Sequence, residues 1–582
     1  MMKRIALIAS VFALFSPGCP WAQDLHKDIT VEQAVTPAKR EASRITVLPT
    51  VQLTPVKAAS LNYSSKVVTT NVPNTFTTLD PVAWGDKLYT SPYRGYFDLG
   101  IGMPVYLGGV SAGYRMVDND RTRLSAWGQY NGDVYKREKV TWHDHTASLG
   151  LDLHQTIGSR STLDGGVNYT YGFHDMPGDL GRFSQSTSRI NASVLFSSSH
   201  SGLSYNAGLK YQHFGFYNPH IPGVDQSTLP DILNDPYNGY EPVRQNLIGL
   251  SLAGRIETGA SSHAGIDIDA NLLATGKYYE ASIPYFEDED MIPMRSRKTA
   301  LVTLNPYFET HSQSATLRIG AEVDFSKNSG KAFHIAPDVT LAWHGSQIFG
   351  IELRGHGGSQ MNSLASLYDI SPYMNGSIAY RHSHIPYALD AKIAFGPFFG
   401  GSIELFGGYA RANDWLMPVV NSIYPAGAVW QPVDICGYHY GVKIGYDNGK
   451  NLAVSVKYEG APGKWDRAYY EWRDRARHVI NAELKVRPVE KLLITAGYEF
   501  RAGRSCYAYT EEPTMIGDLE MWTPERVSMG VVGNLSVGAG YSFTDRLTLF
   551  ARGENLLGRK CVYIGGRPMQ SANVMIGAAL KF

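Results

Sequence analysis

Residues 571–582, at the end of the chain, read SANVMIGAALKF and alternate between two kinds of side chain. Such a period of two places each kind on one face of an extended strand. One face ends on an aromatic residue and is apolar throughout: Ala572, Val574, Ile576, Ala578, Leu580 and Phe582. The other face is mixed and carries Lys581. A last strand that is apolar on one face only is typical of the strand that closes an outer-membrane β-barrel.

The same alternation recurs upstream, for example in residues 162–174, 315–325 and 492–500. In each stretch one face is apolar and the other carries polar or charged side chains, so that the second face is expected to meet water or a polar lumen. The apolar faces run for about ten residues, which is the length that a tilted strand needs to cross a bilayer. Strands of a two-sheet sandwich are usually nearer five or six residues, so length favours the membrane barrel.

Connections between these stretches alternate in length. Short polar turns are expected at 118–120, 158–160, 199–201, 312–314, 345–347, 448–450, 488–490 and 544–546, and longer connections at 218–240, 282–295, 359–386, 413–433, 461–473, 506–525 and 557–570. Bacterial barrels have short periplasmic turns and long outer loops. We therefore predict an all-β chain, a transmembrane antiparallel β-barrel of about 22 strands (20 to 24) from about residue 95 to Phe582, preceded by a short irregular N-terminal segment.

Composition fits a membrane barrel better than a nucleic-acid-binding protein. The net charge is zero, which gives no pull toward nucleic acid. The 36 Tyr suit membrane interfaces, and the 59 Gly suit curved strands and turns. After the N-terminus, no run approaches the 18 or more apolar residues of a membrane helix.

The N-terminus divides into two parts. Lys3 and Arg4 precede an apolar stretch, residues 5–15, and the small residue Ala22 follows, so residues 1–22 are predicted to be a secretory signal peptide. Residues 23–93 lack a sustained period and are rich in Pro and Thr. We interpret them as a periplasmic or lumen-filling segment, followed by the barrel over residues 94–582.

In the C-terminal residues 547–582, an amphipathic strand leads into residues 555–560 (NLLGRK), a loop with Gly566 and Arg567 follows, and the last strand ends at Phe582. This arrangement resembles the end of TonB-dependent outer-membrane receptors. These residues look most like the receptors of Bacteroidota-type bacteria. It implies a barrel that transports or captures a substrate at the outer membrane, and the expected strand number agrees with the 22-stranded transporters.

The chain departs from that family at its beginning. Such receptors carry a TonB-binding box and a globular plug larger than the about 70 residues between Ala22 and the first expected strand. The plug is therefore predicted to be missing or reduced. Because a barrel of this size would leak if it were open, we expect the lumen to be filled by residues 23–93, by an inward-folded connection such as 359–386, or by a partner chain.

Four groups of residues were weighed for binding or catalysis. Two His-x-His pairs, His143 with His145 and His382 with His384, supply only two metal ligands each, and the acidic run 287–290 is interpreted as a solvated loop. Residues 464–473 could grip a ligand by aromatic stacking and Arg forks, or belong to the interfacial aromatic girdle. The candidate ligand contacts in it are Trp465, Arg467, Tyr469, Tyr470, Trp472 and Arg473.

Covalent chemistry has no support in the sequence. No nucleophile-elbow, zinc-protease or phosphate-loop motif occurs, so we predict neither an enzyme nor a bound cofactor or metal. The mature cysteines, Cys436, Cys506 and Cys561, are odd in number and allow one disulfide with one thiol left over, whose pairing stays open.

The sequence thus predicts an exported barrel of the bacterial outer membrane for substrate transport or uptake. Its expected partners are membrane lipid, the barrel-assembly machinery, a periplasmic energy-coupling or plugging protein and an unidentified small-molecule or peptide substrate, with no nucleic acid. The alternative is a non-conducting adaptor barrel for secretion or surface-attachment machinery. The barrel-assembly signal is assigned to the outward side chains of the last strand: Val574, Ile576, Leu580 and Phe582.

Overall fold

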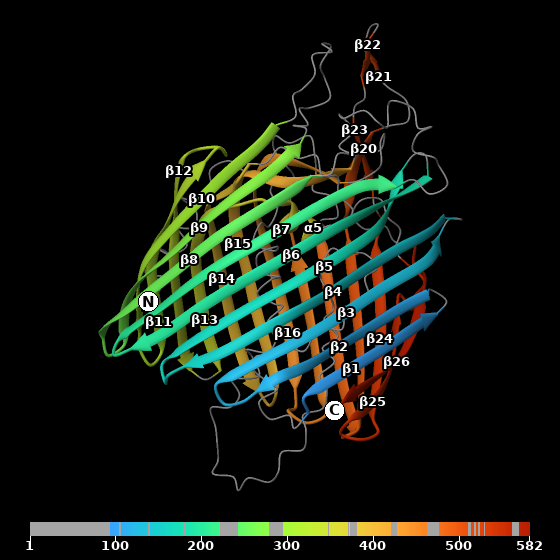
Figure 1. Cartoon of the computed structure of the whole chain (residues 1–582), viewed down its shortest axis with the longest axis horizontal. Coiled ribbons are helices and arrows are strands. Elements are labelled where there is room, and N and C mark those ends of the chain that lie inside the picture. Colours follow the sequence, from blue (N-terminus) through green and yellow to red (C-terminus); the bar gives the residue numbers. More distant parts are fainter. Residues whose placement is uncertain are drawn as a thin grey trace, which may run out of the picture.

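The computed structural model describes most of the chain from residue 93 onward (Figure 1). The described ranges are 93–103, 106–137, 140–178, 181–220, 243–278, 295–346, 348–370, 372, 381–420, 428–461, 476–509, 514–516, 519–521, 524–528, 530–560 and 570–582. The predicted signal peptide, nearly all of the N-terminal segment, the acidic run 287–290 and the six candidate contacts between Trp465 and Arg473 lie outside these ranges.

The described residues form one closed antiparallel sheet of 22 strands, which confirms the predicted fold class. Each strand pairs with the next along the chain, except that β19 pairs with β24 and β1 with β26. The strands are β1 (Gly95–Met103), β2 (Tyr106–Asp118), β3 (Thr122–Arg137), β4 (Val140–Ile157), β5 (Ser161–Gly178), β6 (Gly181–His200), β7 (Leu203–His220), β8 (Arg244–Gly259), β9 (Ser262–Tyr278), β10 (Arg295–His311), β11 (Ala315–Lys327), β12 (Phe333–Ser346), β13 (Phe349–Gln360), β14 (Ser383–Phe398), β15 (Gly401–Val420), β16 (Ala428–Asp447), β17 (Leu452–Gly460), β18 (His478–Val489), β19 (Leu492–Ala502), β24 (Val532–Ser542), β25 (Leu547–Glu554) and β26 (Asn573–Lys581).

Three further elements interrupt this order. The helix α5 (Leu364–Ile370) lies between β13 and β14. Two small hairpins lie between β19 and β24, one formed by β20 (Ser505–Tyr509) and β23 (Pro524–Ser528), the other by β21 (Thr514–Ile516) and β22 (Leu519–Met521). Figure 1 shows the hairpins beyond one end of the barrel. They span residues 505–528 and so overlap the connection expected at 506–525. Among the described residues no helix is long and apolar enough to cross a membrane.

The seam between β26 and β1 closes the barrel. Leu99 of β1 lies opposite Ala578 of β26, and the two strands stay in register from Tyr96 to Met103. The chain ends in the same ladder, because the N–H of Gly95 donates to the carbonyl of Phe582 at 2.8 Å and the N–H of Phe582 donates to that of Gly95 at 3.0 Å. The prediction that the last strand pairs with the first near Gly95 is confirmed.

The two faces of each strand differ as the alternation predicts. On β26, Val574 and Ile576 are 47% and 65% exposed on the outer face, whereas Met575 between them is buried. On the inner face of β1, Asp98 is buried and accepts a hydrogen bond from the Ser111 hydroxyl at 3.2 Å. An apolar outside and a polar inside are what a closed sheet requires when lipid surrounds it and its lumen is polar.

All eight expected short turns lie at one end of the barrel, where they join β2–β3, β4–β5, β6–β7, β10–β11, β12–β13, β16–β17, β18–β19 and β24–β25. Two turns at this end were not anticipated, residues 260–261 between β8 and β9 and residues 399–400 between β14 and β15. The second is an apolar Phe-Gly pair with positive φ at both positions, so it lacks the polar composition by which turns are recognised. We call this the short-turn end.

Candidate functional site

Between β13 and β14 the chain turns back into the barrel, and residues 361–370 are called the lumen segment below. Ser363 begins its helix α5: the Ser363 hydroxyl accepts a hydrogen bond from the N–H of Ser366 at 3.1 Å, and its carbonyl accepts one from the N–H of Leu367 at 3.0 Å. A serine at this position stabilises a helix start because it satisfies a donor that has no partner within the helix. Seven residues are too few for a stable isolated helix, so packing must hold α5 in place.

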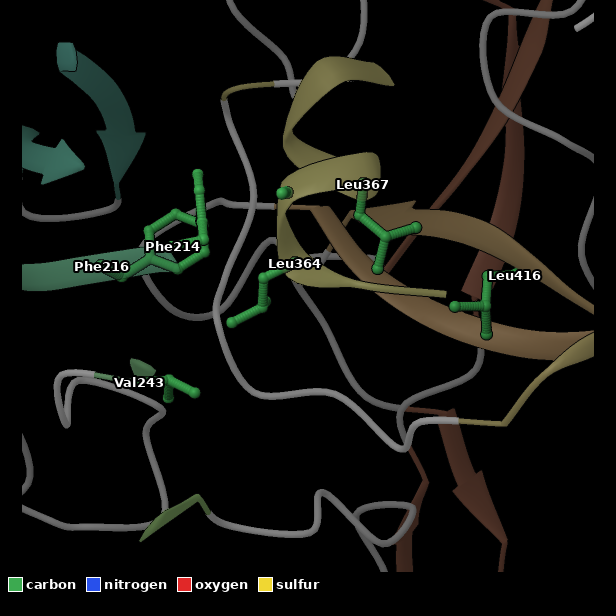
Figure 2. Close-up of a cluster of buried hydrophobic side chains, with 7 residues drawn as sticks. Phe214, Phe216, Val243, Leu364, Leu367 and Leu416 are labelled. Atoms are coloured by element: carbon green, nitrogen blue, oxygen red, sulfur yellow. The ribbon is translucent and has the colours of Figure 1, made fainter. Parts of the chain in front are cut away.

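An apolar cluster attaches α5 to the inner wall (Figure 2). Leu364 is fully buried and Leu367 is 2% exposed. Figure 2 shows these leucines near side chains of the barrel wall. The wall side chains come from two strands and one connection. The cluster consists of Phe214 and Phe216 of β7, Val243 before β8, Leu364, Ala365 and Leu367 of the lumen segment, and Leu416 of β15. Burying each leucine contributes about 1.5–3 kcal/mol, so the cluster is the main attachment.

The two phenylalanines of β7 stand on the face that is otherwise polar. Leu209 and Tyr211 are exposed on the outer face of β7, so Phe214 and Phe216 point inward by alternation. Their rings meet edge to face at 5.1 Å between centroids, and both also contact Tyr368. The wall therefore carries an apolar patch facing α5 rather than lipid.

Arg189 of β6 adds a second attachment. Its guanidinium donates to both carboxylate oxygens of Asp369, at 2.8 and 3.2 Å, and to the carbonyl of Ala365 at 3.1 Å. The same group lies 5.3 Å from the centre of the Phe214 ring and 5.6 Å from that of Tyr368. Arg189 thus binds the helix by an ion pair and by a hydrogen bond to a main-chain carbonyl, and it adds cation–π contacts.

Tyr368 ends a buried polar chain that begins on the barrel wall. Its hydroxyl bonds Nε2 of His174 on β5, and Nδ1 of the same histidine bonds Oδ1 of Asp144 on β4. Thr187 of β6 donates its hydroxyl hydrogen bond to Tyr368 at 3.2 Å. Burial raises the pKa of Tyr368 above its ordinary value, so its hydroxyl stays protonated at neutral pH.

The first and last residues of the inward connection are tied to each other and to the wall. The Asn362 amide donates to the carbonyl of Arg381 at 2.7 Å and to the Ser383 hydroxyl at 2.9 Å. His382 is buried. Its main-chain N–H donates to the Ser329 hydroxyl at 2.6 Å, and its ring Nδ1 lies 3.0 Å from the Ser326 hydroxyl. Burial lowers the pKa of His382 to about 4, with Arg297 a further cause, so this imidazole is neutral at neutral pH.

The members of each His-x-His pair have separate hydrogen-bond partners in the described chain. His382 and His384 bond different hydroxyls, those of Ser326 and Ser359, and His384 packs against the His334 ring at 3.8 Å between centroids. His143 bonds Asp175 and His145 lies 3.0 Å from the Tyr130 hydroxyl. Among the described residues, neither pair is joined by a third ligand close enough to share an ion.

Another group does bring three possible metal ligands close enough to share an ion: His263, Glu309 and His311. No local pattern in the sequence indicates this group, because His263 and Glu309 are 46 positions apart and only the pairing of β9 with β10 brings them together. The wall residues that contact α5 were likewise not predicted. The sequence signal for them is the pair of phenylalanines on the otherwise polar face of β7.

Of the three cysteines considered, Cys436 on β16 is disulfide-bonded. Cys436 lies near the middle of this long strand, and its side chain is buried. The expectation of one disulfide is compatible with this bond, and the partner cysteine lies among residues whose side chains are outside the described set.

No protein-family model matches the sequence, and no curated protein sequence matches it. Solved structures match its fold. A siderophore receptor, PirA from Acinetobacter baumannii, aligns with a TM-score of 0.64 at 9% identity over 84% of this chain and 80% of that chain. A mutant ferric enterobactin receptor, PfeA from Pseudomonas aeruginosa, aligns with a TM-score of 0.60 at 10% identity over the same shares. The FrpB iron transporter from Neisseria meningitidis gives 0.60 at 12% identity over 84% and 81%.

These proteins are receptors and a transporter by name, and at such low identity the likeness shows the fold alone. The predicted resemblance to outer-membrane receptors is confirmed at the level of the fold, because the 22-stranded barrel of this chain aligns with these structures over 84% of its length. The Bacteroidota-type origin and the missing plug stay predictions, and the residues that would decide the plug, 23–92, lie outside the described chain.

Proposed function

We propose that this chain is an outer-membrane uptake barrel whose lumen is narrowed by its own lumen segment, residues 361–370. The observation that carries the proposal is the attachment of α5 to the inner wall by an apolar cluster, by Arg189 and by Tyr368. The fold shared with siderophore receptors and an iron transporter supports the uptake role.

The size of the barrel is the physical reason for a resident constriction. Barrels of 16 to 18 strands already enclose an aqueous channel, and this one has 22. An open pore of that width would let solutes leak across the membrane. A helix fixed to the wall by buried leucines has to break several contacts at once in order to move. It therefore narrows the lumen at rest, and opening the lumen costs free energy.

The cargo is a small polar solute. The lumen wall carries both charge signs and many hydrogen-bonding groups, for example the buried Asp98, Arg115 and His174. Such a lining stabilises polar solutes and rejects lipid. Because the similar structures are named for ferric enterobactin, siderophores and iron, a ferric chelate is the first solute to test.

The other parts of the proposal concern residues before the barrel. Residues 1–22 direct export, and residues 23–93 act as a periplasmic or lumen-filling segment that an energy-coupling or plugging partner engages. Together with the barrel over residues 94–582, this places the chain in the bacterial outer membrane, inserted by the barrel-assembly machinery.

Solute permeation into vesicles tests the narrowing. The full chain is reconstituted, and a variant has residues 364–370 replaced by a Gly/Ser linker of equal length. We expect the variant to admit solutes of larger size, in a swelling assay with sugars of graded mass, than the unchanged chain admits. The matched control is Arg255→Ala, which removes an exposed lumen-facing cation of β8.

Equal permeation by both proteins would contradict the constriction. If both stay impermeable even after residues 23–93 are also removed, the non-conducting adaptor barrel becomes the better account. Uptake itself is tested by supplying a ferric chelate to cells that carry or lack the gene, and equal accumulation would count against the transport role.

A further inference from the structure

Two histidines and a glutamate meet on the lumen wall at the short-turn end of β9 and β10. His263 of β9 lies directly opposite Glu309 of β10, and His311 follows two residues later on the same face. Nε2 of His311 lies 2.8 Å from Oε1 of Glu309, and Nε2 of His263 lies 3.5 Å from Oε2. The two imidazole rings are stacked at 5.6 Å between centroids.

We propose that His263, Glu309 and His311 bind one divalent transition-metal ion, for which Zn²⁺ is the fitting probe. One ligand atom from each residue lies within 4.8 Å of the other two. Ligand atoms about 2.1 Å from a tetrahedral ion are about 3.4 Å from one another, so small side-chain shifts suffice to close the site. The inference is independent of the transport role.

The donor set selects the class of ion. Two imidazoles and one carboxylate suit Zn²⁺ and similar transition metals, whereas Ca²⁺ and Mg²⁺ prefer oxygen ligands alone. Three protein ligands leave one position of a tetrahedral ion for water or another ligand. The burial fits such an open site, because the His263 side chain is 8% exposed and the His311 side chain is 45% exposed.

A second layer of contacts holds the ligands in orientation. The Thr316 hydroxyl lies 3.0 Å from Nδ1 of His311, which leaves Nε2 directed at Glu309. Tyr307 meets the His263 ring edge to face at 6.3 Å between centroids. A hydrogen bond such as that of Thr316 helps to fix the tautomer and the ring direction of a metal-binding histidine, and its loss weakens metal affinity. The Tyr307 contact limits the rotation of the His263 ring.

The neighbouring guanidinium of Arg318 does not fully neutralise the charge of Glu309. Arg318 lies 3.6 Å from Oε2 of Glu309, but its guanidinium donates to Asp338 at 2.9 Å and also lies 3.8 Å from Asp267. Three carboxylates thus surround one guanidinium. The surplus negative charge favours a cation beside Glu309.

Calorimetric titration tests the site. The full chain, purified in detergent and stripped of metal with a chelator, is titrated with ZnCl₂, and the visible absorption of Co²⁺ is recorded as a report of coordination by nitrogen. We expect Glu309→Gln and His311→Ala each to remove one saturable site per chain or to weaken it at least tenfold. Far-UV circular dichroism checks that each variant keeps its strands.

The matched control is His154→Ala. His154 also faces a carboxylate, that of Asp164 at 2.5 Å, near the turn that joins β4 to β5, but no third described ligand completes its group. We expect this variant to bind Zn²⁺ as the unchanged chain does. The proposal is overturned if the unchanged chain shows no saturable site, which is the result for a purely hydrogen-bonded trio. It is also overturned if the control loses as much affinity as His311→Ala.

Discussion

The seam between β26 and β1 and the contact between α5 and the inner wall hold the molecule together by different means. At the seam, main-chain hydrogen bonds join two strands in continuous register from Tyr96 to Met103. At α5, a few side chains make the connection, such as Tyr368 with His174, which are 194 residues apart. This difference predicts the effects of substitutions in the two regions. Substitutions at the seam should affect whether the barrel forms, whereas substitutions at α5 should affect which solutes the lumen admits.

Removal of Phe582 should have the largest effect, because it deletes two main-chain bonds to Gly95 and a ring that stacks with Tyr114 at 6.3 Å between centroids. We expect most of the assembled barrel to be lost from the outer membrane, as measured by heat-modifiable migration in gels. Phe399→Ala, which removes a fully exposed aromatic ring in a turn, should assemble normally. Normal assembly without Phe582 would contradict the role of the seam.

Gly577→Val should destabilise the seam from within. A side chain at Gly577 would meet the Phe550 ring and the carbonyl of Leu99, which is main chain and cannot rotate away. Overpacking of this kind costs about 1–3 kcal/mol. The measurement is the urea midpoint of the full chain in vesicles, compared with Gly254→Val, where an added Cβ has no atom within 4 Å. Equal midpoints for the two variants would refute tight packing at the seam.

Arg189→Ala should loosen α5 and leave the barrel intact. Asp369 is 61% exposed, so the ion pair contributes little, and the cation–π contacts and the bond to the Ala365 carbonyl contribute more. We expect a loss of about 1–2 kcal/mol, seen as roughly tenfold faster hydrogen exchange in residues 364–370. Arg255→Ala is the control. Faster exchange across all strands would mean that Arg189 stabilises the barrel instead.

Tyr368→Phe should have a smaller effect of the same kind. It removes the hydroxyl that bonds His174 and Thr187 but keeps the ring against Phe214. A net loss of about 1 kcal/mol is expected, again confined to exchange in residues 364–370. Tyr171→Phe, on the lipid-facing side of β5, should not change hydrogen exchange in residues 364–370. An equal effect of both variants would contradict a specific contact of the Tyr368 hydroxyl.

The smallest expected effect is a dependence on pH at His382. Its pKa of about 4 lies below the ordinary 6.5, so the unfolded chain binds a proton more readily. The contribution of the neutral imidazole to stability is therefore complete above about pH 6.5 and falls as the pH drops toward 4. Thermal melting from pH 7 to 4.5 should show a shallower decline for His382→Gln than for the unchanged chain. Exposed His344→Gln should leave the curve unaltered, and parallel curves for all three proteins would contradict the assignment.

The seam could be predicted from the sequence because its information is local. A period of two in SANVMIGAALKF already places Val574 and Ile576 outside and Met575 inside. The number of strands followed from counting such stretches between turns. The Phe399-Gly400 turn was missed because it is apolar.

The lumen contacts could be predicted only in part. The connection 359–386 was one of three candidates for filling the lumen, and its residues 361–370 do pack against the inner wall. Which wall residues receive them depends on how seven or more strands are arranged around the barrel, and no local period encodes that. The inward phenylalanines of β7 were the available signal. The trio of His263, Glu309 and His311 depends on strand register alone.

The most direct test of the constriction is the single-channel current of the full chain in planar bilayers, with and without the Arg189→Ala and Tyr368→Phe substitutions together. The account predicts a small conductance for the unchanged chain. It predicts a larger one, or more frequent opening, for the double variant, while the amount of inserted barrel stays the same. Identical currents from the two proteins at equal insertion would show that α5 does not control the lumen.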